Sequence, residues 1–121
     1  MCGVKYYYNT KSEVIKMKKS YIAKKIVFIH NKSIELKKKI DFFHDTHKIT
    51  KRNINQTQLN YILSFLTIIN YLNDYTDFLL KKILIFNRAT KEPLTKKQVY
   101  ILINARKRLK LLKESQKYFL E

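Results

Sequence analysis

The chain has 121 residues, with 26 Lys and Arg against 9 Asp and Glu, which gives a formal net charge of +17. That length supports one domain with a modest core. So large a positive charge destabilises an isolated compact state by self-repulsion. It therefore favours a polyanionic partner, first a nucleic acid and second an anionic membrane surface. The single cysteine, Cys2, excludes an internal disulfide framework, and the single glycine excludes glycine-rich phosphate loops.

Catalytic and metal-binding patterns are missing from the sequence. No nucleophile–base set and no paired-carboxylate motif has supporting context. His44 and His47 have the spacing of a shared helical face, but a third metal ligand is lacking. The longest apolar stretch, residues 59–72, contains four polar residues and so predicts a buried helix rather than a membrane span. We predict a binding protein, not an enzyme, with no cofactor, no metal and no small-molecule substrate.

A long helix is predicted in the first half of the chain, after a tyrosine-rich stretch at residues 1–9 that we expect to be extended and held by a partner. Apolar residues recur every seven positions, with two more between them, and favour one helix of about 30 residues. Lys19 and Ser33 interrupt this stripe, Val27 and Phe28 widen it, and lysines cover much of the remaining surface. These lysines form either a solvated face or, in part, a phosphate contact. The stripe comprises Ile15, Ile22, Ile26, Ile29, Leu36, Ile40 and Phe43.

The middle of the chain predicts two shorter helices. Residues 48–56 are polar and connect the long helix to the next one, which Asn55 or Thr57 can cap. Residues 73–77 are also polar and predict a break, with Thr76 capping a further helix. The expected core-facing residues of the first of these helices are Leu59, Ile62, Leu63, Leu66 and Ile69. In the second, apolar contacts are expected from Phe78, Leu79, Ile83 and Phe86.

The last helix has the clearest start signal. Residues 87–93 read as a loop that ends at Pro93, and Thr95 with Gln98 forms a capping box. Its expected buried side comprises Val99, Leu102, Ala105 or Arg106, Leu109 and Leu112. The predicted fold is all-α, a small helical bundle with a long N-terminal helical extension. The extension is assigned to residues 1–70 and an RNA-binding helical unit to residues 71–121, with a seam near Asn73.

Basic residues are concentrated in the second unit, where eleven Lys or Arg lie between Lys81 and Lys113 against one acid, Glu92. Lys outnumbers Arg 22 to 4, and residues with AT-rich codons dominate the chain. Because lysine was the easier residue to encode, Arg106 and Arg108 are the strongest candidates for bidentate phosphate contacts. The predicted RNA-binding residues are Lys81, Lys82, Arg88 in the loop, Lys96, Lys97, Arg106, Lys107, Arg108 and Lys110.

The same stretch resembles the bacterial-type small-subunit ribosomal protein S-eighteen family over about 40 residues. The matching pieces are Asp74-Tyr75-Thr76-Asp77, Leu79-Leu80-Lys81-Lys82, Arg88-Ala89-Thr90, and Thr95, Lys97, Gln98, Leu102, Ala105, Lys107, Arg108, Lys110 and Leu112. The chain departs from the family pattern in four places. Lys91 replaces a glycine, Glu92-Pro93 is an insertion, Asn87-Arg88 stands for a basic pair, and Lys113 replaces a proline.

The resemblance implies a structural constituent of the small subunit of an organellar ribosome. The partners it implies are small-subunit rRNA on the platform, a ribosomal protein S-six homologue and other small-subunit proteins. The expected location is the mitochondrial matrix, with a plastid-type organelle as the alternative. A family fold that is a small helical bundle agrees with the pattern of the sequence. Two other functions stay open, a DNA-binding helical module and a basic protein on a membrane surface.

Overall fold

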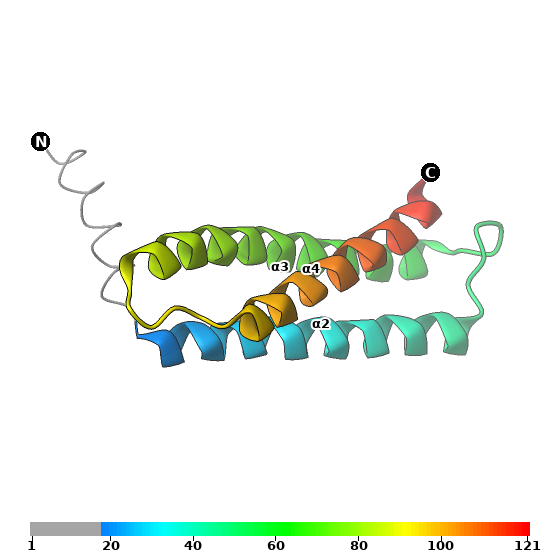
Figure 1. Cartoon of the computed structure of the whole chain (residues 1–121). Coiled ribbons are helices and arrows are strands. Elements are labelled where there is room, and N and C mark those ends of the chain that lie inside the picture. Colours follow the sequence, from blue (N-terminus) through cyan, green and yellow to red (C-terminus); the bar gives the residue numbers. More distant parts are fainter. Residues whose placement is uncertain (1–17) are drawn as a thin grey trace, which may run out of the picture.

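Three long helices make up residues 18–121, the part of the chain that the computed structural model describes (Figure 1). They are α2 (Lys19–His47), α3 (Gln56–Ala89) and α4 (Lys96–Lys117), followed by the short 3-10 helix η1 (Tyr118–Leu120). Successive helices run in opposite directions, and these residues contain no strand. The predicted all-α small bundle is confirmed.

Helix α2 follows the seven-residue pattern of the sequence. The buried residues are Ile22, Ile26, Ile29, Leu36, Ile40 and Phe43, and the interrupting residue Ser33 is buried with them. Ile15 and the segment 1–9 lie outside the described residues. The helix ends at His47, where the predicted pattern ends, and Lys48 takes the left-handed conformation with φ 47° and ψ 49°.

Helix α3 is continuous, so the predicted break at residues 73–77 is wrong. Thr76 is fully buried, and its hydroxyl donates to the Leu72 carbonyl oxygen at 2.6 Å instead of capping a new helix. Inside a helix, a threonine hydroxyl can donate its hydrogen bond to the carbonyl oxygen of the preceding turn. The local sequence therefore does not distinguish a threonine that caps a helix from one buried within it. The boundary drawn between residues 70 and 71 therefore falls inside one helix.

Two capping boxes fix where α3 and α4 begin, and one side-chain hydrogen bond holds the connection between these two helices. Asn55 with Gln58 opens α3, and the predicted pair of Thr95 with Gln98 opens α4. The connection between α3 and α4 is held by Asn87, whose Oδ1 accepts a hydrogen bond from the Leu94 backbone N–H at 2.9 Å. Since Leu94 is also buried, the start of α4 is anchored to the core.

Replacing Thr95 with alanine should lower the free energy of unfolding by about 0.5–2 kcal/mol, because the Gln98 N–H loses its acceptor. Urea titration followed by circular dichroism measures this. The matched control is Thr57→Ala, in the first turn of α3 but not its cap residue. Equal destabilisation by both changes would contradict a capping role for Thr95.

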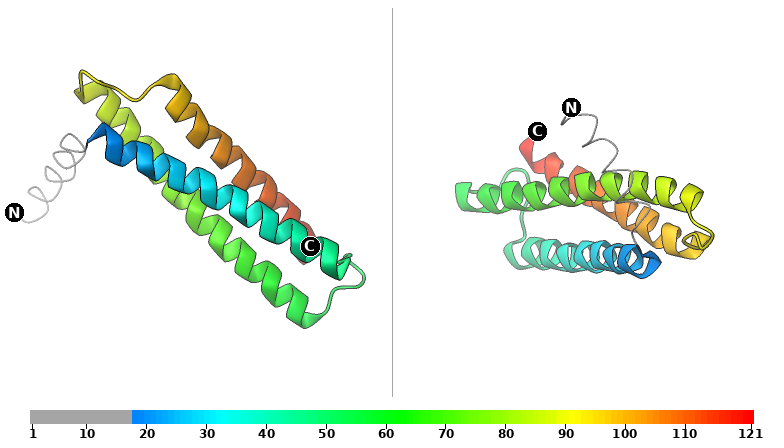
Figure 2. Two further views of the ribbon diagram at one scale, coloured as in Figure 1. Left: turned by 90° about the horizontal axis from the view of Figure 1, so that it is seen from below. Right: turned by 90° about the vertical axis from the view of Figure 1, so that its left-hand side faces the viewer.

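The core lies where α4 packs across α2 and α3 (Figure 2). Helix α4 packs against each neighbour more extensively than these two pack against each other. One cluster contains Ile22, Ile26, Ile29, Leu79, Ile83, Phe86, Leu94, Leu102 and Ala105. A second contains Leu36, Ile40, Ile69, Leu72, Leu109 and Leu112. Because both clusters draw on all three helices, residues 18–121 share one bundle.

Four apolar residues, one of which was expected to face the core, lie toward solvent. Leu63 and Phe78 on α3, and Val27 and Phe28 on α2, are each about half exposed. Predicting Leu63 as core-facing was wrong, because α4 covers only one side of the α2–α3 pair. On its opposite side this pair has no further helix among residues 18–121.

Candidate nucleic-acid interface

Most of the positive charge in the described residues has no acidic partner. Residues 18–121 contain 23 of the 26 Lys and Arg. Among them, only four cations lie within 4.0 Å of a carboxylate of residues 18–121, namely Lys32, Lys37, Lys39 and Arg106. The charges of the remaining cations are not neutralised by any carboxylate of this part of the chain, so they attract anionic ligands.

The outer surface of α4 carries an exposed row that we call the α4 ridge, made of Lys96, Tyr100, Lys107 and Lys110. Its members follow the spacing of one helical face, opposite the residues that α4 buries in the core. No residue of the ridge forms an ion pair with any described carboxylate. Tyr100 is 57% exposed, so the ridge combines ammonium groups with an accessible aromatic ring.

The start of α4 is electrostatically unusual. Lys96 and Lys97 occupy its first turn, which contains no acidic residue. Positive side chains at the positive end of the helix dipole are unfavourable, each by about 0.3–1 kcal/mol. A phosphate bound there would meet both the dipole and the two ammonium groups favourably.

The predicted basic residues of α3 lie near the same connection. Arg88 lies in the last turn of α3 rather than in the predicted loop, and it is exposed. Lys81 is also exposed, while Lys82 is half-buried with its Nζ 4.3 Å from the centre of the Phe78 ring. Arg88 precedes the connection and Lys96 follows it, so residues from both helices flank this end of the bundle (Figure 1).

The two arginines with the strongest predicted phosphate role make contacts within the protein. The Arg106 Nε lies 2.9 Å from the Asp77 Oδ1 on α3, an ion pair without an aligned hydrogen bond. The Arg108 Nη1 donates to the Ser33 Oγ on α2 at 2.7 Å, and that hydroxyl donates to the His30 carbonyl oxygen at 2.8 Å. These contacts tie α4 to both neighbours. Bidentate phosphate binding by either arginine stays a prediction.

The arrangement thus gathers some predicted residues and separates others. Lys96, Lys107 and Lys110 share the α4 ridge, with Lys97 beside its start, whereas the arginines lie at the helix–helix contacts. Sequence reasoning missed Tyr100, although its position four residues after Lys96 was a usable signal.

Two further features were sought in the described part of the chain, a metal-binding cluster and a membrane-crossing helix. Residues 18–121 hold no group of three His, Cys, Asp or Glu side chains placed to bind a metal ion. None of the helices α2 to α4 has a stretch that is both long and apolar enough to cross a membrane.

The fold and the ridge define a class, a small basic three-helix bundle with an exposed cationic and aromatic row on its last helix. No protein-family model, curated protein or solved structure matches the chain.

Proposed function

We propose that this protein is a structural RNA-binding protein that binds the phosphates of the RNA with the α4 ridge and the neighbouring α3–α4 connection. The observation that carries the proposal is the exposed ridge itself, with three lysines that lack acidic partners in the described structure. Phosphate contacts of this kind position a protein on RNA without reading its sequence. Selectivity would then come from the shape of the RNA.

The ridge suits RNA with unpaired bases. Tyr100 lies between Lys96 and Lys107 along the helix, so a base stacked on its ring would leave flanking phosphates near ammonium groups. Base stacking on an aromatic side chain contributes about 1–3 kcal/mol per base. Duplex DNA does not offer an unstacked base, and this favours RNA over the DNA-binding alternative.

The cellular setting that we propose is the small subunit of an organellar ribosome, most simply a mitochondrial one. The support is the ordered resemblance over residues 74–112, whose pieces lie on the second half of α3, on the connection and on α4. The proposed partners remain small-subunit rRNA, a ribosomal protein S-six homologue and other small-subunit proteins. Sedimentation of an organelle lysate tests this setting. The tagged chain should migrate with the small subunit and leave that position when magnesium is removed, whereas migration only at the top of the gradient would contradict it.

Neutralising two ridge lysines should weaken RNA binding without unfolding the protein. For Lys107→Gln with Lys110→Gln, we expect roughly tenfold lower affinity for a labelled RNA hairpin with a single-stranded tail at moderate salt. Two lost phosphate contacts should also reduce the slope of log affinity against log salt by about 1.4. Fluorescence anisotropy over a salt series measures both quantities.

The control for this experiment removes the same charge from another helix. Lys24→Gln with Lys38→Gln changes two exposed lysines on α2 and leaves the ridge intact. The proposal requires a clearly smaller loss of affinity for this pair. Equal losses for both pairs would mean that RNA responds to net charge alone and that the ridge is not the binding site.

A further inference from the structure

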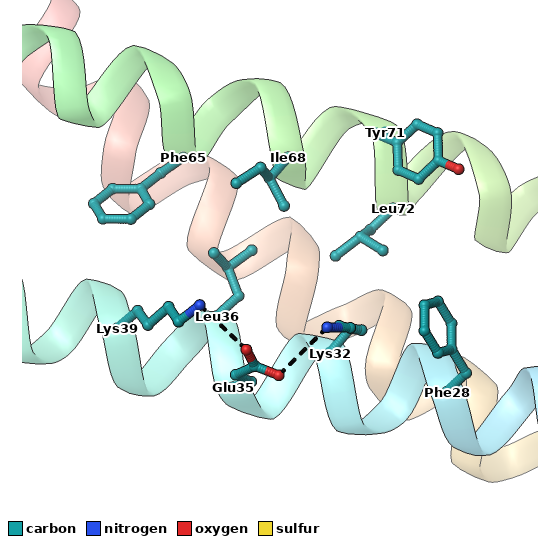
Figure 3. A pocket seen from close by; sticks show the side chains of 9 residues that line it. All are labelled: Phe28, Lys32, Glu35, Leu36, Lys39, Phe65, Ile68, Tyr71 and Leu72. Carbon is teal, nitrogen blue, oxygen red and sulfur yellow. Dashed lines mark ion pairs between the residues drawn. The ribbon is translucent and has the colours of Figure 1, made fainter.

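On the side opposite α4, a groove runs between α2 and α3. Figure 3 shows side chains from both helices pointing into it. Its volume is about 320 Å³, and we call it the α2–α3 groove. Leu36 and Leu72 form its floor, where they join the core cluster that contains Leu109 of α4. Its walls are formed by Phe28 on α2 and by Phe65, Ile68 and Tyr71 on α3.

The walls expose apolar groups in a regular pattern. Phe28 is 49% exposed, Ile68 47% and Tyr71 67%. On α2 a second seven-residue row runs from Tyr21 through Phe28 and Glu35 to Phe42, beside the stripe that is buried in the core. This row spans about 32 Å at the rise of an α-helix, which is the length of a partner helix of roughly 20 residues. A seven-residue row on one helix, beside exposed apolar side chains of its neighbour, forms a surface into which another helix can pack.

The two walls differ in charge. Residues 53–73 contain no charged side chain, a long gap in a chain of which 29% is charged, and they include the part of α3 that lines the groove. On the α2 side, Lys25, Lys32 and Lys39 recur every seven residues. Lys32 and Lys39 share one acid, Glu35, at 3.6 and 3.2 Å, and the hydrogen bond from Lys39 with the charge of Lys32 lowers the Glu35 pKa. One carboxylate between two ammonium groups leaves this rim positive.

We propose that the α2–α3 groove is the docking site for an amphipathic helix of a partner protein, one whose apolar stripe is flanked by Asp and Glu. Such a helix would fill the fourth position of a four-helix arrangement, opposite α4. Its apolar side chains would cover Phe28, Ile68 and Tyr71, and its acids would face the Lys32 and Lys39 rim. The inference is independent of the proposed RNA function, which uses α4.

Charge argues against the other occupants. A second copy of a chain with a net charge of +17 would bring lysines against lysines along this rim. An RNA strand in the groove would place phosphates along the α3 wall, where residues 53–73 supply no cation. Only an occupant that is apolar in the middle and acidic at one edge matches both walls.

The test uses the full chain and a designed probe, a fluorescein-labelled 22-residue helical peptide with leucine on its apolar stripe and glutamate beside it. Fluorescence anisotropy should show saturable binding of this peptide. Two matched peptides, one with lysine in place of glutamate and one with serine in place of leucine, should each bind at least tenfold more weakly. Equal binding of the serine peptide would overturn the proposal, because charge alone would then explain the signal.

Groove variants of the protein locate the binding site. Ile68→Gln with Tyr71→Gln should weaken binding of the acidic peptide at least tenfold while circular dichroism shows an unchanged helix content. Leu111→Gln, at a residue of α4 that is 73% exposed, should leave binding unchanged. The proposal is overturned if the groove pair leaves peptide binding intact, or if it lowers RNA affinity instead. A homodimer in sedimentation velocity that the groove pair abolishes would assign the site to a second copy and would also overturn it.

Discussion

Replacing Leu109 with alanine should cost about 2–5 kcal/mol of the free energy of unfolding. Leu109 is fully buried, in the cluster where α4 meets both α2 and α3. Loss of its side chain would leave a cavity that the three helices cannot all close at once. Because small domains are stable by only about 5–15 kcal/mol, the variant should show a large drop in the midpoint of urea denaturation. Circular dichroism during a urea titration measures this drop, with the slope of the unfolding free energy against urea concentration compared between variant and wild type.

Leu111→Ala provides the control on the same helix. It removes the same atoms two residues away, from a side chain that is 73% exposed. Alanine is a slightly better helix former than leucine, so we expect a change within about 0.5 kcal/mol. If both variants lost similar stability, α4 would not be packed on the bundle in the orientation described.

Replacing Arg108 with alanine should lower the free energy of unfolding by about 1.5–3 kcal/mol, the range for hydrogen bonds that involve a charged group. Its Nη1 donates to the hydroxyl of Ser33, a fully buried residue of α2. Along α2, Ser33 lies between the residues that belong to the first core cluster and those that belong to the second. Much of this loss of stability should come from the interaction between Arg108 and Ser33. In a double-mutant cycle with Ser33→Ala, the interaction energy should therefore exceed about 0.5 kcal/mol.

The same cycle separates the two roles of Arg108. Ser33→Ala removes the internal partner and leaves the guanidinium in place, so RNA affinity should change little. If Arg108→Ala weakens RNA binding while Ser33→Ala does not, the arginine also contacts phosphate. If neither change alters stability, the contact between α4 and α2 through this pair has no energetic role.

Much of the fold was predictable because its signals are local. The seven-residue spacing from Ile22 to Phe43 specifies one face of one helix, and the pairing of Thr95 with Gln98 specifies where α4 begins. Both depend on residues a few positions apart. The break predicted at residues 73–77 failed for the same reason, since a residue such as Thr76 can cap a helix or can lie buried within one with its hydroxyl bonded to the preceding turn.

The candidate site was less predictable because it depends on partners far away in the sequence. Arg106 and Arg108 belong to a basic cluster in the sequence, yet their contacts lie 29 and 75 residues away, at Asp77 and Ser33. Phe28 and Phe78 fit the apolar stripes of their helices as well as the buried residues do, yet both are about half exposed. The position of α4 decides which side of each helix is covered. Counting apolar residues cannot reveal how many helices surround each face.

The position of α4 also has a consequence for biosynthesis. Helices α2 and α3 contact each other less than each contacts α4, and both main core clusters need residues of α4 to close. A ribosome making this chain therefore releases α2 and α3 with their apolar faces open, and the bundle completes only after Leu112 has emerged. Interrupting synthesis before α4 would yield an unfinished hairpin rather than a smaller stable domain, and such a product is a natural substrate for chaperones and proteases.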